Sequence, residues 1–162
     1  MTSNTLEASF LEKNYIKTSP LFKLLVFEIG KLTLALPVKQ VQKVIQHSTT
    51  HGSGLSYVNL VHWGEREIAV VDLHQKLFKI SQPKTNKNKG YFIITQNVGD
   101  EPLGIMVTQT PVLIDVPLSQ IRTIPDSYRR ADTLEIASHV AVISSEEQKS
   151  LTVFILDLER SI

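Results

Sequence analysis

The chain has 162 residues, of which 42% are hydrophobic, so it can bury one domain-sized core or two small adjoining ones. Lys and Arg total 17 against 16 for Asp and Glu, a balance that gives no overall field to attract nucleic acid or an anionic membrane. The sequence contains no cysteine, which excludes disulfides, thiol nucleophiles and thiolate metal sites and favours a cytoplasmic location.

Residues 1–21 are expected to form a flexible leader. Met1–Tyr15 mixes Ser, Asn, Thr, Glu and Lys and lacks the basic start and apolar run of a signal peptide. Further along, no stretch approaches the roughly 18 uninterrupted apolar residues of a membrane span, so we expect no direct membrane insertion.

From Phe22 onward, short apolar runs alternate with Gly, Pro, Asn and Asp, which is typical of an all-β chain of strands and turns. Residues 24–29 and 32–36 flank Gly30, which can supply the positive φ of a tight turn, and they predict a hairpin that ends at Pro37. The segment 38–45 fits either a helical face or a strand, and its β-branched residues favour a strand.

A second strand pair is predicted at 57–63 and 67–71, around a turn at Gly64-Glu65-Arg66. Asp72 then predicts the start of a short helix, because its carboxylate can cap exposed N–H groups and Gln75 holds the third helical position, as in a capping box. The polar segment 81–89 is expected to be a linker that divides the chain near its middle.

The second half repeats the pattern of the first. Strands are predicted at 91–95 and 103–108 around a turn at 98–100, then at 112–116 and 151–156. The last strand runs into Asp157 as the earlier one runs into Asp72. We therefore expect one unit, 22–162, of two duplicated barrel-like subdomains at about 22–80 and 90–158.

The motifs of common enzymes are missing. There is no Gly-rich phosphate loop, no His-Glu-x-x-His and no Gly-x-Ser-x-Gly. His47 and His51 are spaced to share a metal on a helix, but the Ser, Thr and Gly residues around them favour a turn. We expect no catalysis, no cofactor and no metal site.

Two other functions stay open as alternatives. A small-molecule-binding or hydrolytic β-barrel would use His51, Ser53 and Asp72, although capping explains Asp72 more simply. A nucleic-acid-binding barrel would use the lysines at 84, 87 and 89, but these lack aromatic neighbours on which bases could stack.

The placed elements resemble the CheW family, the adaptors of bacterial chemotaxis-like pathways, from Phe22 to Ile162. The residues that carry the resemblance are Phe27-Glu28-Ile29-Gly30, Leu36-Pro37-Val38, Val41-Gln42-Lys43-Val44, Ile68-Ala69-Val70-Val71-Asp72-Leu73, Gly104-Ile105-Met106-Val107 and Val153-Phe154-Ile155-Leu156-Asp157-Leu158. The resemblance implies two intertwined five-stranded SH3-like barrels with short capping helices. It also implies a non-enzymatic adaptor that couples a CheA-type histidine kinase to the cytoplasmic tips of methyl-accepting chemoreceptors.

Several positions depart from the family pattern where the resemblance places receptor contact. Trp63 stands where the family usually has arginine, Val58 where many members have glycine, and Lys43 at a position that is often acidic; Thr108 replaces a common aspartate. These departures suggest a specialised member, from a system controlling type IV pilus motility or light-directed movement.

Contact residues for the two partners are predicted around these departures. Trp63 fits either core packing or an exposed interface anchor, and core packing is an equal alternative for the two valines. The predicted contacts are Val41, Lys43, Val58, His62, Trp63, Gly64 and Arg66.

Overall fold

The computed structural model describes residues 20–47, 50–52, 54, 57–80, 90–96, 101–125, 127, 135–144 and 149–160. Over these residues the chain forms twelve strands, one short α-helix and three 3₁₀ turns. The elements are β1 (Leu21–Ile29), β2 (Leu32–Pro37), η1 (Val38–Gln40), β3 (Val41–Gln46), β4 (His51–Gly52), β5 (Val58–Trp63), β6 (Arg66–Val71), α2 (Leu73–Phe78), β7 (Tyr91–Thr95), β8 (Leu103–Val107), β9 (Val112–Pro117), η2 (Leu118–Gln120), β10 (Ile121–Thr123), β11 (Ala137–Ser144), β12 (Ser150–Leu156) and η4 (Leu158–Arg160).

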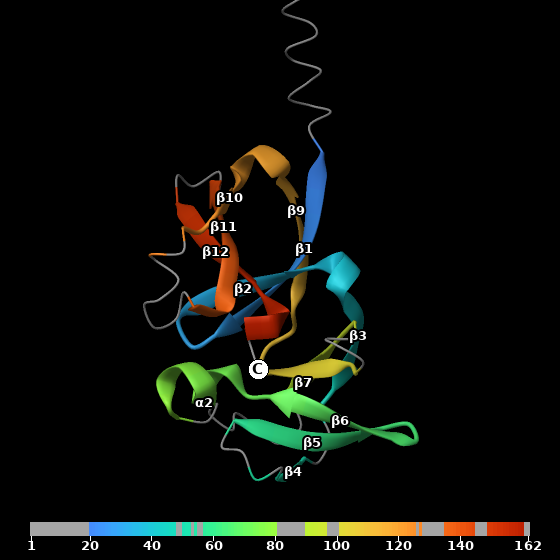
Figure 1. Cartoon of the computed structure of the whole chain (residues 1–162). Coiled ribbons are helices and arrows are strands. Elements are labelled where there is room, and N and C mark those ends of the chain that lie inside the picture. Colours follow the sequence, from blue (N-terminus) through green and yellow to red (C-terminus); the bar gives the residue numbers. More distant parts are fainter. Residues whose placement is uncertain are drawn as a thin grey trace, which may run out of the picture.

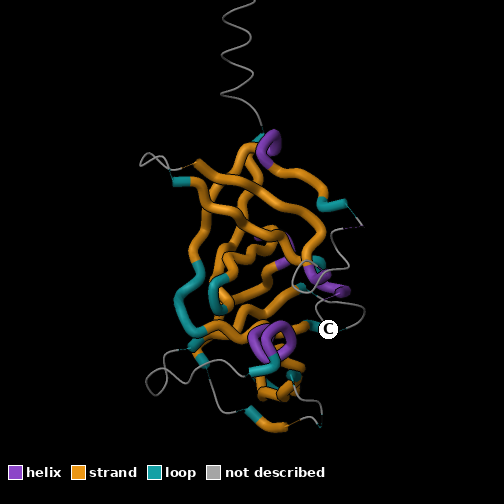
Figure 2. The backbone as a smooth tube through the Cα atoms, turned by 90° about the vertical axis from the view of Figure 1, so that its left-hand side faces the viewer, coloured by secondary structure: helices purple, strands orange, loops and turns teal. Residues whose placement is uncertain are grey.

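The strands form two six-stranded sheets, which lie one above the other in Figures 1 and 2. Sheet A has the order β10-β11-β12-β2-β1-β9, and sheet B has the order β4-β5-β6-β8-β7-β3. The places match one to one, so β1–β6 corresponds to β7–β12. The predicted duplication is therefore present in the strand topology.

Each sheet is completed by a hairpin from the other half of the chain. Sheet A consists of β9–β12 with the hairpin β1–β2, whereas sheet B consists of β3–β6 with the hairpin β7–β8. The joins are parallel strand pairs, in which β2 lies beside β12 and β6 beside β8. The sheets therefore do not follow the segments 22–80 and 90–158, since each takes strands from both. Each also has six strands instead of five, because the short β4 and β10 add to the edges.

Alternation along the strands sorts the apolar side chains into three clusters. Residues Leu25 and Phe27 of β1 face the seam between the sheets, whereas Leu24 faces the interior of sheet A. Strand β6 does the same for sheet B, with Val71 in the seam and Val70 in the interior. The seam cluster is the largest of the three and holds the two sheets together.

The predicted strand pairs are confirmed with small changes at their ends. The first hairpin turns at Gly30, whose φ is +60° and whose Cα lies so close to helix α2 that an added Cβ would be 3.1 Å from the Phe78 ring. Strand β1 begins at Leu21, within the range expected for the leader. The segment after Pro37 contains one 3₁₀ turn, η1, before it becomes strand β3.

The expected helix start at Asp72 is confirmed. The Asp72 Oδ1 accepts the backbone N–H of Gln75 at 3.1 Å, while the backbone N–H of Asp72 donates to the carbonyl of Tyr57 at 2.8 Å. This second bond ties the start of α2 to the start of β5. In the second half Asp157 has the matching position, and its Oδ1 accepts the N–H of Glu159 at the start of η4.

Other parts of the chain differ from the sequence prediction or lie outside the described residues. Strands β4, β10 and β11 were not predicted. The turn at Gly64 contains two residues instead of three, because Arg66 already belongs to β6. The linker 81–89 and the turn 98–100 lie outside the described residues. None of the described helices is long and apolar enough to span a membrane.

Candidate functional site

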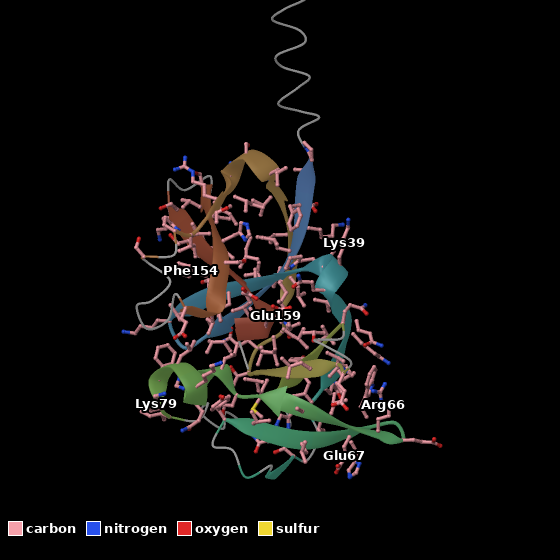
Figure 3. All side chains as sticks on the ribbon, in the orientation of Figure 1. Lys39, Arg66, Glu67, Lys79, Phe154 and Glu159 are labelled. Carbon is pink, nitrogen blue, oxygen red and sulfur yellow. The ribbon has the colours of Figure 1, made fainter. Side chains whose placement is uncertain are left out.

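Six of the seven predicted contact residues lie on strands of sheet B, and Gly64 lies in the turn between two of them. They occupy three places, and Val58 is alone at the start of β5, against the seam. Val41 and Lys43 lie on β3 at one edge, whereas four others gather at the β5–β6 hairpin near the opposite edge. Figure 1 shows this hairpin extending beyond the rest of the sheet, and Figure 3 shows Arg66 near its end. The four residues at the hairpin are His62, Trp63, Gly64 and Arg66.

The hairpin presents a polar tip on an apolar base. Strand β5 places Val61 and Trp63 on the inner face of sheet B and His62 on the outer face. The His62 Nε2 lies 3.5 Å from the Glu67 Oε1 across the strands, and both side chains are at least half exposed. Gly64 has a φ of +66°, which favours glycine in the turn. Water screens this exposed pair, so its free energy contribution is small.

Trp63 is half-buried and packs against the interior cluster of sheet B. The cluster against which it packs includes Val61, Ile68 and Val70. The residue directly opposite on β6 is Arg66, which is exposed. The structure thus combines the two alternatives, because part of the indole ring contributes to the core and part remains accessible at the hairpin tip.

The two predicted valines, Val58 and Val41, differ from each other in burial. Val58 is 7% exposed and belongs to the seam cluster, which matches the core alternative, so little of its side chain can touch a partner. Val41 is half-buried against the same cluster. A bulge between Val41 and Lys43 shifts the register of β3 against β7, and Lys43 is exposed.

Two exposed apolar residues at the seam were not predicted from the sequence. Val44 of β3 lies directly opposite Ile93, and Leu113 of β9 lies directly opposite Leu25; both partners belong to the seam cluster. Val44 and Leu113 are nevertheless 36% and 55% exposed. Since β3 and β9 are equivalent edge strands, each sheet leaves one apolar side chain at the margin of the seam. We call Val41, Val44 and Leu113 the seam rim.

Of the residues of the hydrolytic alternative, His51 lies on the short strand β4, opposite Leu60, where the sequence favoured a turn. Asp72 is 5% exposed and caps α2, while Ser53 lies outside the described residues, as do the lysines at 84, 87 and 89. Within the described residues no three His, Asp or Glu side chains gather as metal ligands.

Among the residues that the structure describes, two side chains have a shifted pKa, and neither belongs to the predicted contacts. Burial lowers the pKa of His47, whose ring centroid lies 4.8 Å from that of Phe92. Burial also lowers the pKa of Lys76, with smaller opposing effects from Glu135, which raises it, and Lys79, which lowers it. The Lys76 Nζ lies 5.3 Å from the centroid of the Tyr57 ring, so it contributes to packing at the base of α2.

Comparison with known proteins identifies the family and the fold of this chain. The model of the CheW-like domain family matches residues 23–162 of the chain. Among solved structures, the scaffolding protein TtCheW from Thermoanaerobacter tengcongensis superposes with a TM-score of 0.68 at 14% sequence identity, covering 86% of each chain. The likeness shows that the two sheets are SH3-like barrels of the CheW fold. A search of curated proteins found no match.

Proposed function

Because the chain belongs to the CheW-like domain family, we propose that it is a non-enzymatic adaptor of chemotaxis-type signalling in the cytoplasm. Its partners are a CheA-type histidine kinase and the cytoplasmic tip of a methyl-accepting chemoreceptor. The solved relative is described as a scaffolding protein, which supports the adaptor role. A pathway of pilus or light-directed movement stays a hypothesis that rests on the altered hairpin at Trp63.

The observation that carries the proposal is the seam rim. Exposed apolar side chains that adjoin a large buried cluster favour docking of another protein, because the partner extends an existing core. A receptor tip is helical, and a helix can place apolar side chains along such a margin. The receptor surface therefore includes Val41, Val44 and Leu113.

The hairpin tip supplies a second, more polar surface. Arg66 is an exposed cation, and the accessible part of Trp63 is an apolar anchor of the kind that dominates interfaces. Because the seam rim fits the helical receptor tip, we assign this surface, with His62 and Gly64, to the regulatory domain of the kinase, although the resemblance places receptor contact at Trp63. Replacement of an arginine by Trp63 makes the contact depend more on apolar burial and less on bidentate hydrogen bonding.

Charge substitutions at the seam rim test the receptor assignment. Val44→Glu and Leu113→Glu place a carboxylate where the partner would bury apolar surface, so each should weaken receptor binding about tenfold or more. The control is Leu151→Glu, since Leu151 is 45% exposed on a strand end that borders the interior of sheet A instead of the seam.

Binding of a purified receptor cytoplasmic fragment would be measured by calorimetry, and folding by urea denaturation. The proposal expects the rim variants to lose affinity while Leu151→Glu does not, with similar unfolding midpoints for all three. Unchanged receptor affinity in both rim variants would remove the seam rim from the receptor surface.

A further inference from the structure

The hairpin β1–β2 has an unusual combination of connections. It lies first in the described chain but pairs with strands of the second half, β1 with β9 and β2 with β12. Its covalent link to the rest of the described residues is η1 alone. The matching hairpin β7–β8 has chain on both sides that leads into the body. Unlike β7–β8, the hairpin β1–β2 is joined to the rest of the described body at one end, so it can leave its site with its preceding chain attached and enter another without threading.

The link η1 contains a buried polar atom for which the described residues offer no hydrogen-bond partner. This atom is the Gln40 Oε1. The backbone of the same residue is held, since the Gln40 carbonyl accepts the N–H of Gln96 at 2.7 Å. A buried acceptor without a donor destabilises the closed link, and opening of η1 would return this oxygen to water.

We propose that the hairpin β1–β2 is exchanged between two copies of this chain, with η1 as the hinge. In such a dimer, β1 and β2 of one copy lie against β9 and β12 of the other, and every contact of the hairpin is repeated between chains. Only the hinge changes, and it loses its unpartnered acceptor. Short connections between packed elements favour this kind of exchange.

The exchanged dimer forms during folding or at high protein concentration. Leu24, Phe27 and Leu34 are each at most 3% exposed, so the hairpin must give up most of its core before it can move. Exchange between folded chains is therefore slow, and a dimer persists after dilution. The short link keeps the hairpin at a high effective concentration near its own site, which favours the monomer in dilute solution.

A disulfide between β1 and β9 distinguishes the two states. Lys23 and Asp115 are directly opposite, their Nζ and Oδ1 are 3.9 Å apart, and about half of each side chain is exposed. The chain has no cysteine, so the pair Lys23→Cys with Asp115→Cys introduces the only thiols. The disulfide links β1 and β9 within one chain in the monomer, but between two chains in the exchanged dimer.

The control pair is Val142→Cys with Thr152→Cys, which joins β11 to β12 at exposed, directly opposite positions. Neither strand belongs to the moving hairpin, so this disulfide stays within one chain in both states. The full-length variants would be refolded at low and high concentration, oxidised, diluted and separated on a denaturing gel without reductant. We expect covalent dimers for the first pair after refolding at high concentration, and monomers for the control.

A second measurement uses the hinge in the chain without cysteines. Gln40→Met keeps the shape of the side chain but removes the orphaned acceptor, so it should raise the dimer dissociation constant about tenfold. Dimer fractions would be measured by light scattering after refolding. Exclusively intrachain disulfides at every concentration, together with no dimer of the unmodified chain, would overturn the proposal. A noncovalent dimer with intrachain disulfides would show association of two copies without exchange and would overturn it as well.

Discussion

Thr95 closes the end of the β7–β8 hairpin through its side chain. It is completely buried, and its Oγ1 donates to the carbonyl of Leu103 at 2.8 Å and accepts the N–H of Leu103 at 3.2 Å. Thr95→Val keeps the shape but leaves two buried backbone groups without these bonds. The free energy of unfolding in urea should fall by about 1–3 kcal/mol. Thr95→Ser, which keeps the hydroxyl, should lose less; equal losses would contradict the role of the hydrogen bonds.

His47 links stability to pH. Burial holds its folded-state pKa below the ordinary value of 6.5, so the unfolded chain binds this proton first as the pH falls. The contribution of the neutral imidazole to stability is present above pH 6.5 and declines below it, until the folded-state pKa is reached. Urea midpoints of the unmodified chain and His47→Gln, measured across this range, should converge toward lower pH. A constant difference between them would contradict the shift.

At the scale of elements, Asp72 fixes the junction between strand β6 and helix α2. Its carboxylate accepts the N–H of Gln75, and helix α2 has only six residues, so the cap serves a large share of the helix. Asp72→Ala should lower the free energy of unfolding by about 1 kcal/mol, whereas Asp72→Asn keeps an acceptor and should lower it less. Equal stability of the alanine variant and the unmodified chain would show that the cap does not matter.

The elements that the sequence predicted best are those with strong local signals. The first hairpin has a glycine in its turn and a proline at its end, and the helix start has an aspartate at the cap. Strand β11 was missed because its fully buried positions are the small residues Ala137 and Ala141, which give a weak apolar pattern. Strand β10 has only three residues.

At the scale of the whole molecule, the residue pattern could not predict that each sheet contains a hairpin from the other half of the same chain. Alternation along β1 indicates that it has two faces, but Leu24 and Leu25 are both buried, so neither face is marked as outer. The partner of a strand then depends on contacts far apart in sequence. The repeated strand-turn-strand pattern did indicate the duplication, although not that each half completes the other.

The candidate functional site, too, could be predicted from the sequence only in part. Trp63, Gly64 and Arg66 could be located at one hairpin from the sequence, because they are adjacent in the chain. Val44 and Leu113 could not be linked, because their relation depends on β3 and β9 holding equivalent edges of two sheets. An exposed apolar residue in a strand also has the same local sequence pattern as a buried one.

The central claim is that this chain joins two other proteins. The most direct test is size-exclusion chromatography of the kinase and the receptor cytoplasmic fragment from the same organism, with and without the chain. We expect the kinase and the receptor to elute together in a larger complex when the chain is present, and to separate more when it is absent. If the chain elutes alone in every mixture and binds neither protein, the adaptor function is wrong.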